Sequence, residues 1–222
     1  MKTRICRLHG KGDIRIEEID VAEPGSGEVL VAMGAGGICG SDLHYYQDGG
    51  FGPIRVREPI ILGHEVAGTI HAVGPQVEEL APGDRVAVNP SRPCNQCRYC
   101  LAGLQQHCMT MRFFGSALRF PHEQGGFRDL MVVDAYQCVK LENDEVSLAE
   151  AACAEPLAVC LHALNRAGAS AGNLAGKTAL VSGAGPIGAL VIAALRHAGA
   201  SRIVATDLQD ATLAVAQRMG AD

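Results

Sequence analysis

Four of the nine cysteines in this 222-residue chain fall within one short segment, CNQCRYCLAGLQQHC. Cys94, Cys97, Cys100 and Cys108 follow the spacing C-x2-C-x2-C-x7-C. Four thiolates on one loop suit a closed tetrahedral zinc site. Such a closed shell leaves no position for a substrate, so the spacing predicts a structural zinc ion.

Disulfides, a redox-active pair and an iron–sulfur cluster are the alternatives for this segment. Disulfides are rare in the reducing cytosol, where we expect this chain to be. A redox pair needs two cysteines, which is fewer than this segment supplies. Ferredoxin spacing matches the first three cysteines but not the last. Zinc is therefore favoured over the other three.

A second group of candidate ligands comes from separate parts of the chain. Cys39 lies in GGICGSDLHYY and His64 in GHEVAGTIHAVG, while Glu65 and Glu155 supply carboxylates. Cysteine, histidine and glutamate with water in a remaining position compose a catalytic zinc shell. Each residue alone has an ordinary explanation: a cysteine after an apolar strand is usually core, and Glu155 suits a helix start.

Three polar residues near Cys39 could assist such an ion. Asp42 could accept a hydrogen bond from the second ring nitrogen of His64 and fix its tautomer. Ser41 and His44 offer a hydroxyl and an imidazole that are suited to passing a proton outward.

The segment GAGPIG predicts a dinucleotide-binding turn. It follows a predicted strand, opens an apolar helix, and is followed by Asp207 at the end of the next strand. Glycines permit close approach of the pyrophosphate, the helix N-terminus faces it, and the acid holds the ribose diol. No arginine follows Asp207 to pair with a 2′-phosphate, so NAD is favoured over NADP. The expected cofactor-binding residues are Gly183, Gly185, Pro186, Ile187, Gly188 and Asp207.

Composition excludes several classes of partner. Apolar residues make up 48% of the chain and its net charge is −5, with no basic tract. Nucleic acid and anionic membrane surfaces are therefore poor partners. The charged N-terminus is not a signal peptide, and the uncharged run from Thr178 to Leu195 contains glycines and a proline that favour a buried strand, turn and helix. We expect a cytoplasmic protein with a small-molecule substrate.

The first part of the chain is expected to be β-rich. β-branched and apolar runs bounded by Gly, Pro or Asp predict strands over 14–19, 28–33, 65–73, 84–88 and 127–133.

From Ser147 the sequence becomes alanine-rich and helical. It then predicts strands over 177–182 and 201–207, with helices over 186–199 and 211–220. This alternation begins a parallel α/β sheet. Two strands are too few for a doubly wound sheet of about six, so we expect the remainder of that domain to be absent from this chain.

Together these motifs resemble the zinc-dependent medium-chain dehydrogenases, and GHEVAGTIHAVGPQV is similar to their zinc signature. The resemblance extends from about Ile5 to Asp222. It implies a GroES-like catalytic domain over 1–146 and the N-terminal part of a Rossmann domain over 147–222. It also implies that Cys39 and His64 bind catalytic zinc. A glutamate at 155 resembles the sorbitol dehydrogenase branch, and either Glu65 or Glu155 would be a ligand.

The implied reaction is reversible oxidation of a secondary alcohol, with hydride passing to the nicotinamide. Zinc lowers the pKa of the hydroxyl, and the proton leaves through Ser41, the cofactor ribose and His44. The resemblance favours a sugar acid, L-idonate, giving 5-keto-D-gluconate. Arg112 and Arg119 are candidates to meet its carboxylate.

Two alternatives stay open: a dehydrogenase for a polyol such as sorbitol or xylitol, and a non-catalytic zinc- and nucleotide-binding sensor. A sensor would not need the proton relay of Ser41 and His44, which argues against it. The family resemblance also implies a homo-oligomer, either a dimer or a tetramer.

Overall fold

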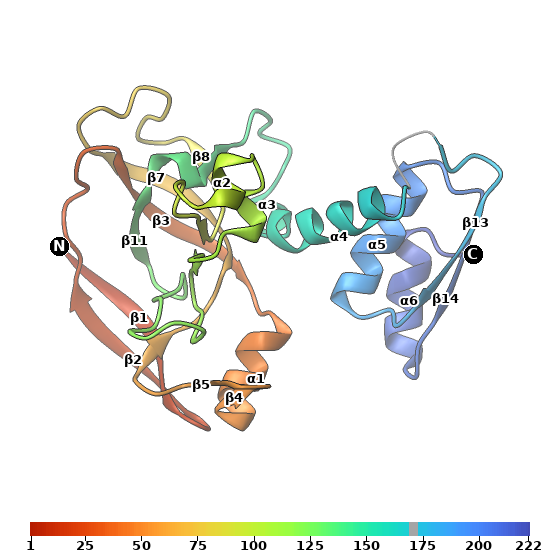
Figure 1. The fold of residues 1–222 in the computed structure, drawn as a ribbon, viewed down its shortest axis with the longest axis horizontal. Coiled ribbons are helices and arrows are strands. Elements are labelled where there is room, and N and C mark those ends of the chain that lie inside the picture. Colours follow the sequence, from red (N-terminus) through yellow and green to blue (C-terminus); the bar gives the residue numbers. More distant parts are fainter. Residues whose placement is uncertain (169–172) are drawn as a thin grey trace. The chain divides into compact units, whose positions relative to one another are not determined.

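The computed structural model describes residues 1–168 and 173–222. They pack as two compact units, Met1–Glu155 and Pro156–Asp222 (Figure 1). The α/β fold with a β-rich first part, predicted from the sequence, is confirmed. The assignment of 1–146 and 147–222 to a catalytic and a nucleotide-binding domain stays a prediction.

A five-stranded antiparallel sheet organises the first unit. Its strand order is β11 (Leu130–Asp134), β3 (Glu28–Gly37), β7 (Glu65–Val73), β8 (Arg85–Val88) and β12 (Cys138–Lys140). One face carries the main core, in which Val29, Val31 and Val86 are fully buried. Each such side chain contributes about 1.5–3 kcal/mol to folding relative to an exposed one.

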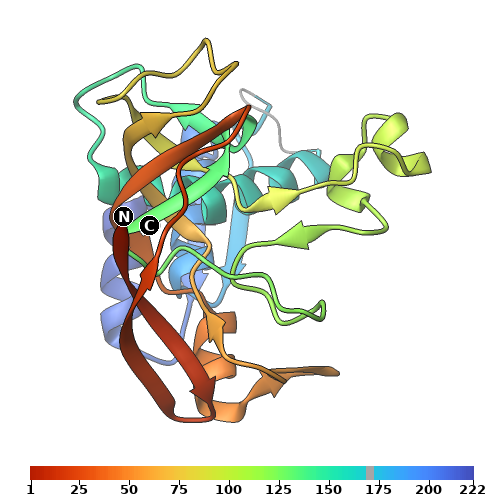
Figure 2. The same ribbon diagram turned by 90° about the vertical axis from the view of Figure 1, so that its left-hand side faces the viewer.

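Smaller sheets complete the first unit. The long hairpin of β1 (Lys2–Gly10) and β2 (Asp13–Asp20) pairs with β6 (Ile60–Ile61) in a three-stranded sheet (Figure 2). Two short antiparallel pairs are formed by β4 (Gly50–Phe51) with β5 (Ile54–Arg55), and by β9 (Ser91–Arg92) with β10 (Arg112–Phe113).

The helices of the first unit are short. α1 (Gly40–Asp48) follows β3, and α3 (Leu148–Ala152) packs small side chains on the sheet, where Ala151 and Ala152 meet Ala67 and Ala87. The cysteine-rich loop between β9 and β10 projects from the sheet, in yellow-green in Figure 2. The loop and the later turn contain α2 (Arg98–Leu101), η1 (Gln105–His107) and η2 (Ala135–Gln137).

The second unit alternates helices with a parallel pair of strands. α4 (Ala154–Arg166) leads into it, and β13 (Thr178–Ser182) pairs in parallel with β14 (Arg202–Thr206). α5 (Pro186–His197) connects the two strands, and α6 (Asp210–Met219) follows. The core of this unit contains Ile192 and Ile203, both fully buried.

Several details differ from the sequence predictions; β3, for example, runs from Glu28 to Gly37 and so extends beyond the predicted 28–33. The alanine-rich segment after Ser147 forms two helices, because α3 ends at Ala152, with Cys153 as its C-cap, and α4 begins at Ala154. The strand predicted over 127–133 corresponds to β11, which begins only at Leu130. β1 and α1 were not predicted as separate elements.

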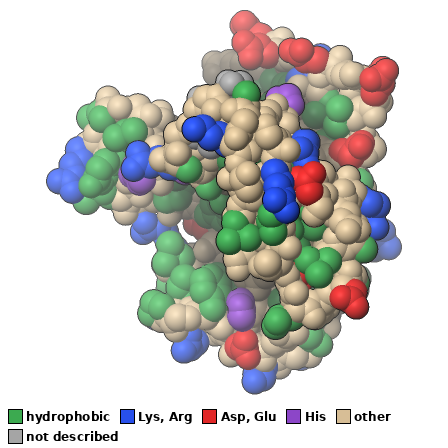
Figure 3. All heavy atoms as spheres, turned by 90° about the vertical axis from the view of Figure 1, so that its right-hand side faces the viewer, with side chains coloured by type: hydrophobic (Ala, Val, Ile, Leu, Met, Phe, Trp, Pro, Cys, Tyr) green, Lys and Arg blue, Asp and Glu red, His purple; other side chains and the backbone are tan. Residues whose placement is uncertain are grey.

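The described part of the chain contains no helix that is long and apolar enough to cross a membrane. On the face drawn in Figure 3, lysine and arginine side chains lie in small groups among uncharged ones.

Candidate functional site

The loop between β9 and β10 brings the four clustered cysteines together. Their sulfur atoms lie within 4.8 Å of one another, with Cys94 Sγ 4.0 Å and Cys97 Sγ 3.5 Å from Cys100 Sγ. A disulfide would need about 2.05 Å, whereas four sulfurs about 2.3 Å from one tetrahedral ion are about 3.8 Å apart. The separations therefore fit a zinc ion.

Two thiols of this group have pKa values that are shifted in opposite directions. A hydrogen bond with the Thr110 hydroxyl, helped by backbone N–H groups, lowers the pKa of Cys94 to about 6. Burial raises the pKa of Cys100 to about 12. Four thiolates cannot coexist in so small a space without a positive charge between them.

A second, separate group consists of Cys39, His64 and Glu65. One ligand atom from each lies within 4.8 Å of the others. His64 is buried, while Cys39 and Glu65 are partly buried. A thiolate, an imidazole and a carboxylate are the donor types of a catalytic zinc site.

The Asp42 carboxylate joins the two segments that carry these ligands. Cys39 N–H donates to Asp42 Oδ2 at 3.0 Å, and Gly63 N–H donates to Asp42 Oδ1 at 3.3 Å. Cys39 is the residue before α1, and Gly63 directly precedes His64. One buried side chain thus holds the two ligand-bearing segments next to each other. Its burial raises the pKa of Asp42.

His64 has a buried ring nitrogen whose environment suits a metal-bound imidazole. His64 Nδ1 has no hydrogen-bond partner among the described residues, and Asp42 Oδ1 lies 3.9 Å from it. That distance is too long for a hydrogen bond, but a small approach would let Asp42 fix the tautomer, as in other metal-bound histidines. The Phe113 ring, 5.3 Å from the His64 ring between centroids, covers it.

Cys39 and His64 also shift each other's pKa values. A hydrogen bond from His64 is the main cause that lowers the pKa of Cys39, and the Ser41 hydroxyl adds to it. Burial works against a charged imidazole at His64, yet Cys39 and Asp42 outweigh it and raise the pKa of His64.

The two candidate glutamates occupy different positions. Glu65 belongs to the ligand group and packs on Gly37, where a Cβ would lie 2.1 Å from Glu65 Oε2. Glu155 lies outside the group, although its charge helps to raise the pKa of His64. Burial raises the pKa of both carboxyl groups.

The residues predicted to move a proton lie on α1. Ser41 is partly buried beside Cys39, whereas the side chain of His44, one helical turn further on, is 59% exposed. His44 Nδ1 lies 3.2 Å from Asp48 Oδ2. A partly buried hydroxyl followed by an exposed imidazole is the order that outward proton transfer requires; the role itself stays a prediction.

The turn between β13 and α5 has the features that a bound pyrophosphate needs. Gly183 has a left-handed φ of 88°, and a Cβ on Gly188 would lie 1.9 Å from Gly183 O. A Cβ on Gly185 would meet nothing within 4 Å, so the protein itself leaves open space there. Glycine at 188 permits close helix–strand packing, and glycine at 185 leaves room for a ligand backbone.

Asp207 lies against this turn. Ala184 N–H donates to Asp207 Oδ2 at 2.7 Å, and Gln209 N–H donates to Oδ1 at 3.0 Å. The Ala184 bond is the main cause that lowers the pKa of Asp207. The carboxylate is therefore ionised and held at the turn. Pro186 and Ile187 begin α5 after Gly185, which lies at its N-cap.

The two arginines proposed for a sugar-acid carboxylate contact other groups of this chain, and their role toward a substrate stays a prediction. Arg112 Nε contacts Glu123 Oε1, while Arg119 Nε donates to Met111 O. Both arginines line a pocket that contains none of Cys39, His64 and Glu65. Successive side chains along β10 point to opposite faces of the strand pair. Phe113 packs on His64, so its neighbour Arg112 points to the other face.

The chain is similar to several known proteins. Residues 25–143 match the family described as Alcohol dehydrogenase GroES-like domain. L-idonate 5-dehydrogenase (NAD(P)(+)) of Escherichia coli K12 is 42% identical in an alignment of 224 residues, which covers 100% of this chain and 62% of that protein. Sorbitol dehydrogenase of Bos taurus is 41% identical over 215 residues, 97% of this chain and 58% of that protein.

The crystal structure of L-idonate 5-dehydrogenase from E. coli K-12 has a TM-score of 0.88 at 42% identity, covering 100% of this chain and 62% of that one. The chain thus spans about three fifths of the length of the relatives it matches.

Proposed function

Since the chain belongs to the alcohol dehydrogenase GroES-like family of zinc-dependent medium-chain dehydrogenases, we propose that it carries the catalytic zinc site and the first cofactor-binding elements of an NAD-linked dehydrogenase. The proposed substrate is a small molecule with a secondary alcohol. The observation that carries this proposal is the group of Cys39, His64 and Glu65.

This group supports catalysis rather than a structural role. Three protein ligands leave a position open, whereas the four cysteines of the loop between β9 and β10 would close their shell. A zinc ion held by Cys39 and His64, with Glu65 or Glu155 as a further ligand, supplies a Lewis acid that makes an alcohol more acidic.

The remaining residues position groups and move a proton. Asp42 holds the segments of Cys39 and His64 together through backbone N–H groups. The Ser41 hydroxyl would accept the alcohol proton while it releases its own, and the exposed His44 would pass a proton to solvent. Gly183, Gly185 and Gly188 would bring the cofactor pyrophosphate to the start of α5.

L-idonate is the proposed substrate, with 5-keto-D-gluconate as its product. The proposal is supported by the E. coli relative, which is 42% identical across the whole of this chain. A polyol such as sorbitol is the second candidate. It is supported by the sorbitol dehydrogenase of Bos taurus, which is 41% identical over 97% of this chain.

A comparison of substrates tests the proposed function. In full-length protein with NAD, we expect kcat/KM for L-idonate to exceed that for sorbitol and xylitol by at least about tenfold, because binding energy from the carboxylate favours the reacting complex. Initial rates of NADH formation measure it. A larger kcat/KM for sorbitol would establish the polyol alternative, and no turnover of any alcohol would contradict the enzyme proposal.

NAD is proposed over NADP, although the name of the E. coli relative includes both cofactors. Asp207 should accept hydrogen bonds from the ribose hydroxyls, and a 2′-phosphate would place like charge against it. We expect kcat/KM to favour NAD on the order of 10²-fold.

Replacing Asp207→Ser together with Leu208→Arg should erode the preference for NAD, because it removes the repulsion and adds a phosphate partner. Asp210→Ser is a matched control, since Asp210 is an acidic residue on the same segment at the start of α6. The control should keep the preference within about twofold. Equal use of NAD and NADP by the unchanged protein would show that another group governs the choice.

A further inference from the structure

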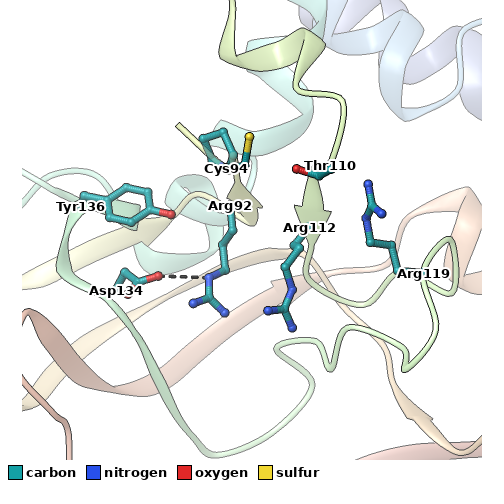
Figure 4. Close-up of a pocket in the computed structure, with 8 residues that line it drawn as sticks. Arg92, Cys94, Thr110, Arg112, Arg119, Asp134 and Tyr136 are labelled. Atoms are coloured by element: carbon teal, nitrogen blue, oxygen red, sulfur yellow. Dashed lines mark ion pairs between the residues drawn. The ribbon is translucent and has the colours of Figure 1, made fainter. Parts of the chain in front are cut away.

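A pocket of about 380 Å³ lies at the base of the cysteine-rich loop (Figure 4). Three arginines line it, Arg92 from β9, Arg112 from β10 and Arg119 from the segment beyond, together with the hydroxyl groups of Thr110 and Tyr136. None of the ligands of the proposed catalytic zinc ion contributes to it.

Two of these arginines face each other across a strand pair. Arg112 and Arg92 are register partners in the antiparallel pair β9–β10, and their side chains extend in the same direction in Figure 4. Like charges directly opposite each other destabilise a sheet. An anion between them would convert this repulsion into attraction.

The way each arginine is anchored leaves donors available. Arg92 contacts Asp134 Oδ2 through Nε at 3.0 Å, and Arg112 contacts Glu123 through Nε. Arg119 Nε donates to Met111 O at 2.7 Å. Arg92 and Arg112 are held through Nε, which leaves both terminal nitrogens of each guanidinium, whereas Arg119 also uses one terminal nitrogen to donate to Met109 O at 3.2 Å. A guanidinium fork is the geometry that binds oxyanions bidentately.

Two of the three arginines are paired with carboxylates. Asp134 and Glu123 offset Arg92 and Arg112, whereas the described contacts of Arg119 are to the backbone carbonyls of Met111 and Met109. The charge of Arg119 therefore has no carboxylate partner among the described residues, and the Cys94 sulfur also lines the pocket. The side chain of Arg112 is 56% exposed and that of Arg92 is 37% exposed, so both guanidinium groups can be reached from solvent.

We propose that this pocket binds an oxyanion, namely a phosphate group that is either free or carried by a small metabolite. Terminal nitrogens of the three arginines would donate to it, with the Tyr136 hydroxyl as a further donor. Because Arg92 and Arg112 lie on the two strands from which the cysteine-rich loop emerges, a bound phosphate would bridge the base of that loop. The inference does not depend on the substrate proposed above.

Binding of inorganic phosphate to the zinc-loaded chain, measured by calorimetry at constant ionic strength with chloride as the reference salt, tests this proposal. We expect saturable binding of one phosphate per chain. Arg119→Gln should weaken it at least about tenfold, because a charged fork is lost. Arg98→Gln, which removes an arginine stacked on Tyr99 elsewhere on the loop, should leave it within about twofold. A sugar phosphate measured in parallel distinguishes the two sources: tighter binding than inorganic phosphate assigns the pocket to a metabolite.

Other outcomes would overturn the proposal. Absence of saturable binding above the chloride reference would do so without any variant. The proposal would also be overturned if Arg119→Gln left phosphate affinity unchanged and only made the chain release zinc to a chelator faster. The arginines would then serve to offset the thiolate charge of the four-cysteine group. A phosphate-induced change of oligomeric state in sedimentation, without binding of one phosphate per chain, would assign the pocket to a carboxylate from a second copy.

Discussion

In full-length protein, Cys39→Ala is expected to lower NAD-linked alcohol oxidation by about 10³-fold or more. Loss of one of the ligands should release the catalytic zinc ion, and a Lewis acid at the reacting oxygen contributes several kcal/mol, of which about 4 kcal/mol corresponds to that factor. The fold should survive, because Cys39 is only partly buried and Asp42 would still bind the backbone of both segments.

Zinc content must be measured on the same samples. The Cys39→Ala protein should lose one zinc ion per chain and retain the other. Cys153→Ala is the matched control, since Cys153 is an exposed thiol outside both groups, and it should keep both ions and full activity. An inactive Cys39→Ala protein that retained both ions would contradict the ligand assignment.

Cys100→Ser is expected to have its largest effect on stability. Cys100 is the buried member of the four-cysteine group, and its sulfur lies 4.0 Å from Cys94 Sγ and 3.5 Å from Cys97 Sγ. A structural zinc site contributes directly to folding, so its loss should lower the free energy of unfolding by about 4 kcal/mol or more.

Denaturant unfolding, zinc content and kcat of the folded fraction separate the two effects of Cys100→Ser. We expect one zinc ion to be lost, a lower unfolding midpoint, and a kcat that changes less than tenfold, because the loop supplies no ligand to the second group. If stability stayed the same while kcat fell strongly, the four-cysteine site would have a catalytic role, which would contradict its assignment as a structural zinc site.

The strands that the sequence predicts well have strong local patterns. β7 has the predicted limits, 65 and 73, because an apolar run is bounded by His64 and Gly74. α1 could not be predicted in the same way, since only Asp42 and Tyr45 are buried in it and it has no apolar stripe. It depends instead on Asp42 bonding the N–H of Cys39 and on a left-handed Gly49, which are tertiary and capping effects.

The site shows a similar division. The four cysteines are close in sequence, so their spacing alone indicates one ion. Cys39 and His64 are 25 positions apart, and only the pairing of β3 with β7, which places Gly37 opposite Glu65, brings their segments together. Sequence reasoning did not identify Phe113 as a neighbour of His64. Alternation along MRFFG offered a signal, since it places Arg112 and Phe113 on opposite faces.

The most direct test of the proposed zinc dependence is the activity of full-length protein from which the more weakly held zinc ion has been removed by a chelator. NAD-linked oxidation of L-idonate or sorbitol should disappear as one zinc ion per chain is lost, with the fold retained by circular dichroism. Adding back one equivalent of zinc should restore it. Oxidation that continues unchanged after both ions have been removed from folded protein would contradict the account.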